Sequence, residues 1–222
     1  MPDSQIKVEH IHHCGSDLTT VNAARVSFDK QSDWVYTGIA QEGLSDRDEK
    51  LIHYLAKHKH LSPFGHSFAS FRVTAPVFVV RQLVKHKFLR MNEISRRYVD
   101  SEPEFYVPDV WRGKAKNRKQ GSEGEVSTYN TAAVSLWYDD ALKYYNMLLE
   151  DGVAPEQARM ILPQAMMTSW YWSGSLDAFA AMCSLRCKPD TQHESQLVAN
   201  QIDDIMTGLF PVSWSALRAY ED

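Results

Sequence analysis

The segment SFASFRVTA, residues 67–75, alternates from Ala69 onward between apolar and polar side chains. Successive side chains of a β-strand point to opposite faces, so this alternation predicts a strand that is buried on one side. Pro76 follows directly, and proline suits the first position of a helix because the N–H that it lacks would have no partner there. The segment therefore predicts a strand that passes directly into a helix.

Helical patterns cover most of the remaining chain. Ser45 marks one helix start, because its hydroxyl can accept a hydrogen bond from the unpaired amides of the first turn. Since strand patterns are few, we expect an α+β fold, in which a helix-rich single domain over residues 1–222 packs a small mixed or antiparallel sheet against a helical layer. The expected helices cover residues 17–27, 129–150, 176–185 and 191–209, and the segments that begin at Ser45, Pro76 and Pro155.

The composition is that of a globular domain. The chain has 222 residues, of which 44% are hydrophobic and 23% charged, and its net charge is −4. This balance gives no reason to expect a nucleic-acid or membrane partner, and no apolar run approaches the roughly 20 residues of a membrane-spanning helix. The three cysteines form no regular disulfide framework, and the N-terminus lacks a basic region followed by an apolar run. We therefore expect a cytoplasmic protein.

Residues 113–128 are polar and contain glycine, which predicts an exposed, flexible loop within this domain. Its basic side chains could contact nucleic acid. Glu123 and Glu125 follow closely in the sequence, so a solvated loop is the better interpretation.

Two histidine-rich segments are candidate metal-binding sites. Residues 10–14 contain three histidines and a cysteine, but their spacing matches no standard zinc motif, and a surface strand or loop accounts for them. Residues 58–66 contain three more histidines without an accompanying cluster of cysteines or carboxylates. We therefore expect no metal site.

Positive charge is concentrated in residues 81–97, where seven basic side chains accompany a single acid, Glu93. Cations this crowded repel one another unless solvent or an anion lies between them. A solvated basic face is one interpretation. An anion-binding site is favoured because the first part of the segment has an apolar side that anchors it, and because Asn92, Ser95 and Tyr98 add hydrogen-bonding groups. Phosphate recognition uses such a mixture of cations and directional donors.

The same segment resembles the signature of a known enzyme family. Arg81-Gln82-x-x-Lys85-His86-Lys87-x7-Ser95 is similar to the Arg-His-Arg-x7-Ser signature of the flavin-dependent thymidylate synthases, the ThyX family. Other family motifs have counterparts in the same order along residues 17–194. These counterparts are Asn22-Ala23-Ala24-Arg25-Val26-Ser27-Phe28, His58-x-His60-x-Ser62-Pro63-Phe64-x-His66, Ala158-Arg159-x-x-Leu162-Pro163, and Leu185-Arg186 followed by Gln192-x-Glu194.

The resemblance implies a specific reaction. Members of the family convert dUMP to dTMP, with methylenetetrahydrofolate as carbon donor and NADPH-reduced FAD as hydride source, in a homotetramer whose sites are shared between subunits. The chain has no Gly-x-Gly-x-x-Gly run, so FAD would not occupy a Rossmann site. The family also uses no cysteine nucleophile. Cys183 and Cys187 agree with this, because they lie in an alanine-rich helical stretch that is typical of core thiols.

Position by position, the resemblance implies two sets of binding residues. Ser95 and Arg97 would hold the dUMP phosphate, while Arg159 would face the base and stabilise negative charge that develops on it. Arg159, Ser95 and His60 are the expected catalytic residues, with His60 lining the flavin and folate site. The full dUMP set is Gln82, Glu93, Ser95, Arg97, Arg159 and Arg186. The FAD set is Ser27, Ser62, Lys85, His86, Lys87 and Ser175.

The sequence also departs from the family pattern. Lys85 and Lys87 replace two arginines and lack their planar donor fork, so we expect weaker FAD or dUMP binding, or compensation by Arg90. Gly65 replaces an acid that contacts FAD, and residues 191–196 depart from the family's late motif. These changes indicate a divergent, phage-type member. They leave two alternatives: a pyrimidine-nucleotide hydroxymethylase or a synthase acting on another base, and a non-catalytic nucleotide-binding homologue.

Overall fold

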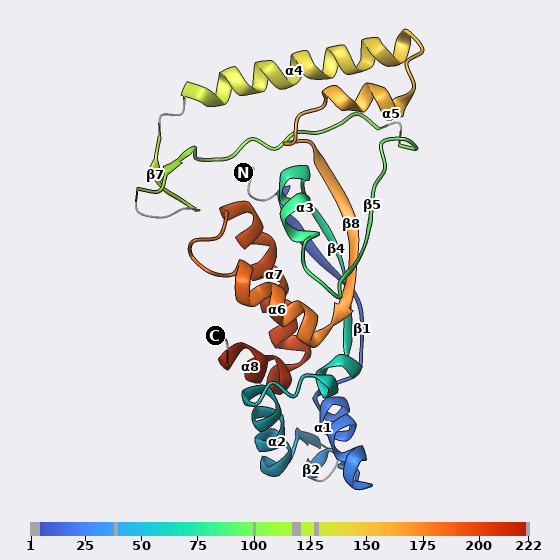
Figure 1. Cartoon of the computed structure of the whole chain (residues 1–222), viewed down its shortest axis with the longest axis vertical. Helices are drawn as coiled ribbons and strands as arrows, with labels where there is room; N and C mark the ends of the chain where they lie inside the picture. The colour runs from blue at the N-terminus through green and yellow to red at the C-terminus, as the bar shows by residue number, and fades with distance from the viewer. Residues whose placement is uncertain (1–4, 38–39, 100, 117–120, 127–128, 221–222) are drawn as a thin grey trace.

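The computed structural model describes residues 5–37, 40–99, 101–116, 121–126 and 129–220. An antiparallel sheet of four strands runs along the long axis of the molecule (Figure 1). Helices cover one face of this sheet, a long helix lies beyond one end, and a smaller group of helices lies at the other end. Within the described residues, no helix combines the length and apolar character needed to cross a membrane.

The main sheet has the strand order β1-β4-β8-β5, and each neighbouring pair is antiparallel. This confirms the expected α+β fold with a small sheet. The two central strands, β4 and β8, pair along their whole length, with Phe71 opposite Trp172. The strands of the main sheet are β1 (Lys7–Cys14), β4 (Phe68–Pro76), β8 (Met167–Ser175) and β5 (Arg90–Glu93).

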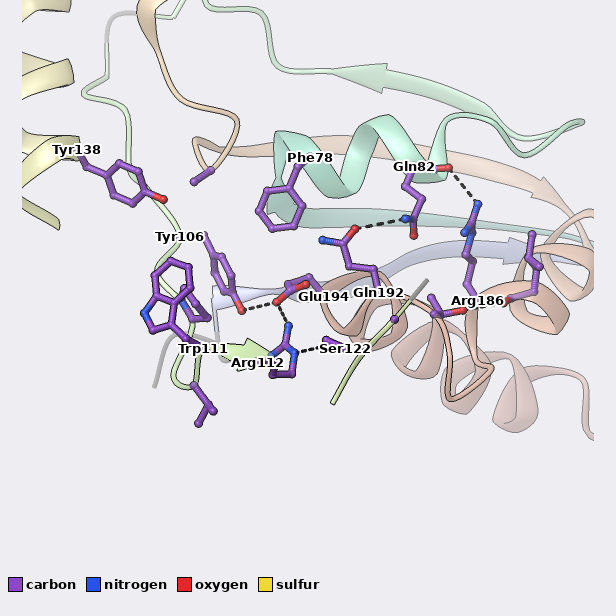
Figure 2. Close-up of a pocket in the computed structure, with 16 residues that line it drawn as sticks. Phe78, Gln82, Tyr106, Trp111, Arg112, Ser122, Tyr138, Arg186, Gln192 and Glu194 are labelled. Atoms are coloured by element: carbon purple, nitrogen blue, oxygen red, sulfur yellow. Dashed lines mark hydrogen bonds and ion pairs between the residues drawn. The ribbon is translucent and has the colours of Figure 1, made fainter. Parts of the chain in front are cut away.

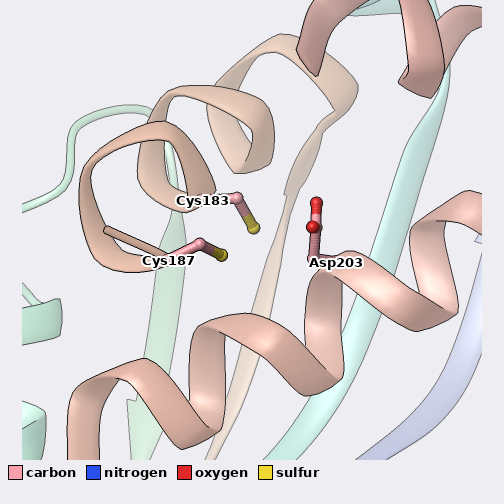
Figure 3. A group of neighbouring side chains, drawn as sticks. All are labelled: Cys183, Cys187 and Asp203. Atoms are coloured by element: carbon pink, nitrogen blue, oxygen red, sulfur yellow. The ribbon is translucent and has the colours of Figure 1, made fainter. Parts of the chain in front are cut away.

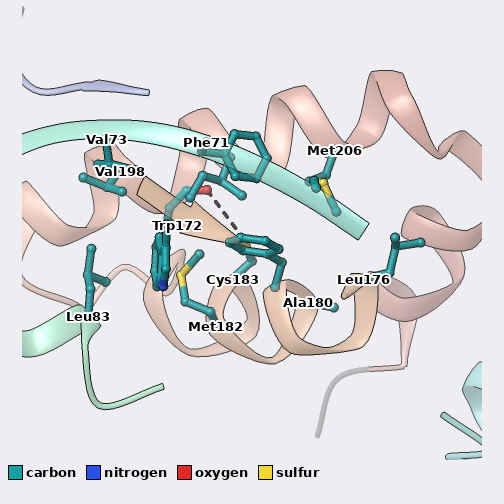
Figure 4. Close-up of a cluster of buried hydrophobic side chains, with 14 of the residues drawn as sticks. Phe71, Val73, Leu83, Trp172, Leu176, Ala180, Met182, Cys183, Val198 and Met206 are labelled. Carbon is teal, nitrogen blue, oxygen red and sulfur yellow. Dashed lines mark hydrogen bonds between the residues drawn. The ribbon is translucent and has the colours of Figure 1, made fainter. Parts of the chain in front are cut away.

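The strand predicted from residues 67–75 is confirmed. Ala69, Phe71, Val73 and Ala75 are buried, whereas Arg72 is exposed on the opposite face. The buried side chains meet helices α6 (Leu176–Arg186) and α7 (His193–Leu209), which cover that face (Figure 4).

Aromatic rings join the sheet to this helical layer. The Phe179 ring lies edge-on to the rings of Phe71 and Trp172, with centroid separations of 5.1 and 5.5 Å. Edge-to-face pairs add to the free energy gained by burying apolar area. The core therefore fixes α6 against the two central strands.

Most of the other helices lie close to their predicted positions, but the helix over Pro211–Ala219 was not predicted. The Ser45 hydroxyl accepts a hydrogen bond from the Asp48 amide and caps the helix that follows, as expected. Pro76 immediately precedes the helix after β4. The remaining helices are α1 (Asp17–Arg25), α2 (Asp46–Lys57), α3 (Val77–Leu83), α4 (Tyr129–Glu150), α5 (Pro155–Ala158), α8 (Pro211–Ala219) and the 3-10 turns η2 (Val26–Phe28), η3 (Ser62–His66) and η4 (Arg159–Ile161).

Two segments differ from expectation. The helix after Pro76 was expected to carry Arg81, Lys85 and Phe88 along one line. It ends at Leu83, and the chain then turns through Phe88, whose φ of 64° is left-handed, into β5. Part of the expected loop 113–128 is ordered as strand, because β6 (Arg112–Lys114) pairs with β7 (Ser122–Glu125). Residues 117–120 and 127–128 of that loop lie outside the described residues. A second small pair joins β2 (Val35–Thr37) to β3 (Ala40–Gly43).

Candidate functional site

A cavity of about 810 Å³ lies where α3, the end of α6, the start of α7 and the β6–β7 hairpin meet (Figure 2). Two residues of the predicted dUMP set, Gln82 and Arg186, line it. Its walls combine aromatic rings with a few polar side chains, which is the usual character of a small-molecule site. The lining residues are Phe78, Gln82, Tyr106, Pro108, Val110, Trp111, Arg112, Gly121, Ser122, Tyr138, Ala165, Leu185, Arg186, Thr191, Gln192 and Glu194.

Arg186 is the last residue of α6. Its guanidinium is held by Gln82 on α3 and by His86 on the turn that follows α3. Its Nε donates a hydrogen bond of 2.9 Å to His86 Nε2, and its Nη2 lies 3.5 Å from the carbonyl oxygen of Gln82. The Gln82 side chain donates in turn to Gln192 Oε1 at 3.3 Å. These contacts leave Gln82 Oε1 buried without a hydrogen-bond partner among the described residues. The cavity therefore offers a fixed guanidinium beside an unused acceptor.

His86 is neutral in this arrangement. Burial, together with the positive charge of Arg186, lowers the pKa of His86 from 6.5 to about 4. Because Nε2 accepts the Arg186 hydrogen bond, the ring proton is placed on Nδ1. His86 thus orients the guanidinium as an acceptor and adds no positive charge to the cavity.

The low pKa of His86 predicts that the stability of the folded chain decreases as the pH falls. A proton binds this ring more weakly in the folded chain than in the unfolded chain, so the neutral ring contributes fully to stability above about pH 6.5. That contribution is lost as the pH falls from 6.5 towards 4. An NMR titration of the His86 ring should show a midpoint near 4, and Arg186→Gln should raise it. A wild-type midpoint near 6.5 would contradict the Arg186–His86 contact.

The opposite wall of the cavity is built around a buried carboxylate. Glu194, in the first turn of α7, is only 4% exposed. It pairs with Arg112 on β6 and accepts a hydrogen bond of 3.4 Å from the Tyr106 hydroxyl. Arg112 also donates to Ser122 on β7 at 3.0 Å. The carboxylate thus holds the β6–β7 hairpin against α7.

A close backbone contact fixes the same hairpin to the segment between α6 and α7. Gly121 has a φ of +83°, and a Cβ at this position would lie 2.8 Å from the Asp190 carbonyl oxygen. Only glycine allows both the conformation and the approach. Glu194 was recognised from the sequence as part of a motif without a role, and Tyr106 and Arg112 were missed.

The other residues of the predicted dUMP set lie elsewhere in the described chain. Glu93, the last residue of β5, accepts a hydrogen bond from Thr168 on β8. Arg159 is exposed in η4. Ser95 Oγ accepts from Arg97 Nε at 3.3 Å, and the Arg97 guanidinium lies 4.8 Å from the centroid of the Tyr98 ring. Arg97 lines a separate hollow of about 210 Å³, which it shares with residues of α4 and with Pro155.

The predicted FAD set is dispersed over the surface of the chain. Lys85 and Lys87 are exposed on the turn after α3, where His86 joins them. Ser27 in η2, Ser62 in η3 and the expected catalytic His60 are exposed as well. Ser175 differs, because it is buried at the start of α6 and its hydroxyl donates to Asp177 at 2.6 Å.

The sequence and the structure of the chain are similar to those of known proteins. Residues 9–212 match the family model described as "Thymidylate synthase complementing protein". Flavin-dependent thymidylate synthases from Thermus thermophilus and Kosmotoga olearia are 36% and 35% identical to this chain, over 96% and 91% of it and over 76% and 85% of their own lengths. A UMP/dUMP methylase, PolB from Streptomyces cacaoi bound with 5-Br dUMP, superposes with a TM-score of 0.85 at 32% identity, covering 97% of this chain and 96% of its own.

Proposed function

The chain belongs to the thymidylate synthase complementing protein family, the flavin-dependent thymidylate synthases, and we propose that it converts dUMP to dTMP in the cytoplasm. Methylenetetrahydrofolate is the carbon donor, and NADPH-reduced FAD is the hydride source. The proposal is carried by one observation. Gln82 on α3 and Arg186 on α6, which are 104 residues apart, line one cavity, and Gln82 Oε1 has no hydrogen-bond partner among the described residues.

The chemistry of this cavity suits a uracil ring. The imide edge of uracil presents a donor N–H between two carbonyl acceptors. Gln82 Oε1 is the unused acceptor for that N–H, and the Arg186 guanidinium supplies donors for a carbonyl oxygen. As the carbon or the hydride is transferred to the ring, negative charge develops on that oxygen, and a fixed guanidinium stabilises it. In this proposal Arg186 and Gln82 bind and polarise the base.

The residues assigned to FAD fit an anionic cofactor. Lys85 and Lys87 present two exposed ammonium groups on either side of His86, which accepts a hydrogen bond from the cavity residue Arg186, and this suits a diphosphate. Ser27 and Ser62 offer exposed hydroxyls. Ser175 is the exception, because Asp177 already occupies its hydroxyl. When bound, reduced FAD supplies the hydride, and the chain's part is to hold it beside the nucleotide.

We further propose that each dUMP site combines residues of two subunits of a homotetramer. Within one chain, Arg97, whose Nε donates to Ser95 Oγ, borders a different hollow from the cavity that contains Gln82 and Arg186. A nucleotide needs its base and phosphate held together, so the phosphate set of one subunit would complete the base set of another. A site shared between subunits explains why the base-binding and phosphate-binding residues lie apart in one chain, and it keeps both groups of residues in the proposed dUMP site.

The decisive experiment uses the purified full-length protein with FAD. We expect a flavin absorption spectrum, NADPH oxidation that dUMP stimulates, and a product with the mass of dTMP when methylenetetrahydrofolate is present. Failure to bind flavin in an excess of FAD would reject the proposal. A hydroxymethylated product would instead identify the chain as a hydroxymethylase.

One comparison favours a second substrate. The similar PolB protein is a UMP/dUMP methylase, and a further PolB structure, bound with 5-Br UMP, superposes on this chain with a TM-score of 0.82. We propose UMP as the alternative substrate to be run in parallel in the same assay. Turnover of UMP at a rate comparable with dUMP would show that the site does not discriminate the 2′-hydroxyl.

A further inference from the structure

A cluster of three metal-ligating side chains lies between α6 and α7 (Figure 3). Its members are Cys183, Cys187 and Asp203, and their ligand atoms all lie within 4.8 Å of one another. Cys183 is fully buried, while Cys187 and Asp203 are partly exposed, so a small ion can reach the cluster from one side. The proposed thymidylate synthase reaction uses none of the three.

The two thiols are placed together by helix geometry. Residues four apart share one face of an α-helix, and Cys187, which caps the end of α6, still has helical backbone angles. Cys183 and Cys187 therefore direct their sulfurs into the same gap. The Cys183 thiol donates a weak hydrogen bond of 3.7 Å to the Ala199 carbonyl oxygen on α7. The two sulfur atoms lie within 4.8 Å of each other. The pair thus forms a dithiol rather than two independent core residues.

Asp203 is fixed on the facing helix by groups that do not belong to the cluster. Its Oδ1 accepts hydrogen bonds from Trp214 Nε1 at 2.9 Å and from Arg218 Nε at 2.8 Å, both on α8. A carboxylate has about four lone-pair sites on its two oxygens, so Asp203 keeps acceptor capacity for a ligand. Partners that orient a ligand in this way are a regular feature of protein metal sites.

The charges of the site also balance around a cation. Two thiolates and one carboxylate carry three negative charges, which one divalent ion together with the Arg218 guanidinium neutralises. Thiolate ligands select thiophilic ions such as Zn²⁺ over Mg²⁺ or Ca²⁺. With a water molecule as fourth ligand, the set matches the tetrahedral preference of Zn²⁺.

We propose that Cys183, Cys187 and Asp203 bind one Zn²⁺ ion that clamps the end of α6 to α7. Cys187 directly follows Arg186, so the clamp also steadies the helix end that carries this cavity residue.

A disulfide is the competing use of the same dithiol, and helix geometry disfavours it. Side chains four apart on a helix have Cβ atoms about 5–6 Å from each other, whereas a disulfide requires about 3.5–4.5 Å. Oxidation would therefore have to open the last turn of α6. A zinc ion about 2.3 Å from each sulfur joins them without that change.

The test is a metal titration of the reduced, metal-free, full-length protein under anaerobic conditions. Co²⁺ serves as the spectroscopic probe, because thiolate-bound Co²⁺ absorbs in the near ultraviolet. We expect one equivalent of Co²⁺ to produce this absorption and one equivalent of Zn²⁺ to abolish it. These readouts do not depend on activity, so they stand apart from the outcome of the thymidylate synthase assay.

Matched variants decide whether this cluster is the site. Cys187→Ser should weaken Zn²⁺ binding by at least about 100-fold, and Asp203→Asn by at least about 10-fold, since loss of even a group that only orients a ligand costs about 10- to 100-fold. Cys14→Ser, which removes the exposed cysteine of β1, should leave the affinity unchanged. Circular dichroism controls for folding. Absence of the thiolate absorption in the wild type, equal affinity in Cys187→Ser, or a Cys183–Cys187 disulfide that forms in preference to the zinc complex would overturn the proposal.

Discussion

Arg186→Ala is expected to lower kcat/KM for dUMP by about 100- to 1000-fold, the usual cost of removing one donor from developing negative charge. The guanidinium is held in the cavity by His86 Nε2 and the Gln82 carbonyl, so no reorganisation is needed when the base binds. Arg186 lies at the end of α6 and outside the apolar core, so the variant should fold. Steady-state kinetics with dUMP, together with circular dichroism, measure both effects.

Two further variants sharpen this prediction. Arg186→Lys keeps the charge but loses the planar fork, and its activity should fall between those of the wild type and the alanine variant. Lys188→Ala removes an exposed cation from the same connection between α6 and α7 and should change little. If Arg186→Ala kept kcat/KM within about threefold of the wild type, the cavity would not be the dUMP site.

Elements with strong periodicity were predicted from the sequence, and some with weaker cues were missed. The strand at residues 67–75 and the helix at 129–150 were found because their patterns are long and regular. β8 was missed although buried Trp170 and Trp172 alternate with polar neighbours, because its small and polar residues dilute the pattern. The helix at Pro211–Ala219 was missed as well, since a short C-terminal segment gives few turns from which to recognise a period.

The sequence indicated which residues belong to the site, but it did not indicate how they are arranged in space. The family motifs selected Gln82 and Arg186, but nothing in their spacing indicates that α3 and the end of α6 face one cavity. Tyr106 and Arg112 carry no local pattern at all, because their partner Glu194 lies 88 and 82 residues away in the sequence. Such contacts are set by the packing of the hairpin against α7, which depends on the tertiary structure.

The separation of the two halves of the dUMP site leads to the second large effect. Arg186→Ala removes a residue of the base-binding cavity, and Arg97→Ala removes the guanidinium that lines the other hollow. Each variant alone should keep only a small residual activity, because each loses one half of every site. If the two halves come from different subunits, mixed oligomers of the two variants should recover activity.

The expected recovery follows from random assembly. In an equal mixture, a site is complete only when the subunit that supplies its cavity carries Arg186 and the subunit that supplies its phosphate set carries Arg97. Each condition is met half of the time, so roughly a quarter of the wild-type activity should return. Coexpression of the two variants with different affinity tags, followed by tandem purification and kinetics, measures this recovery in oligomers that contain both.

A matched mixture separates shared sites from any other effect of mixing. Gln82 and Arg186 line the same cavity of one chain, so Gln82→Ala and Arg186→Ala damage the same half of a site. Oligomers that combine these two variants should gain nothing, because no subunit supplies an intact cavity. Recovery in this control would point to a change in stability rather than to shared sites. Purified mixed oligomers of Arg186→Ala and Arg97→Ala that recovered no activity would show that one chain holds both halves, and the separation seen between the two hollows would then have to close within that chain when dUMP binds.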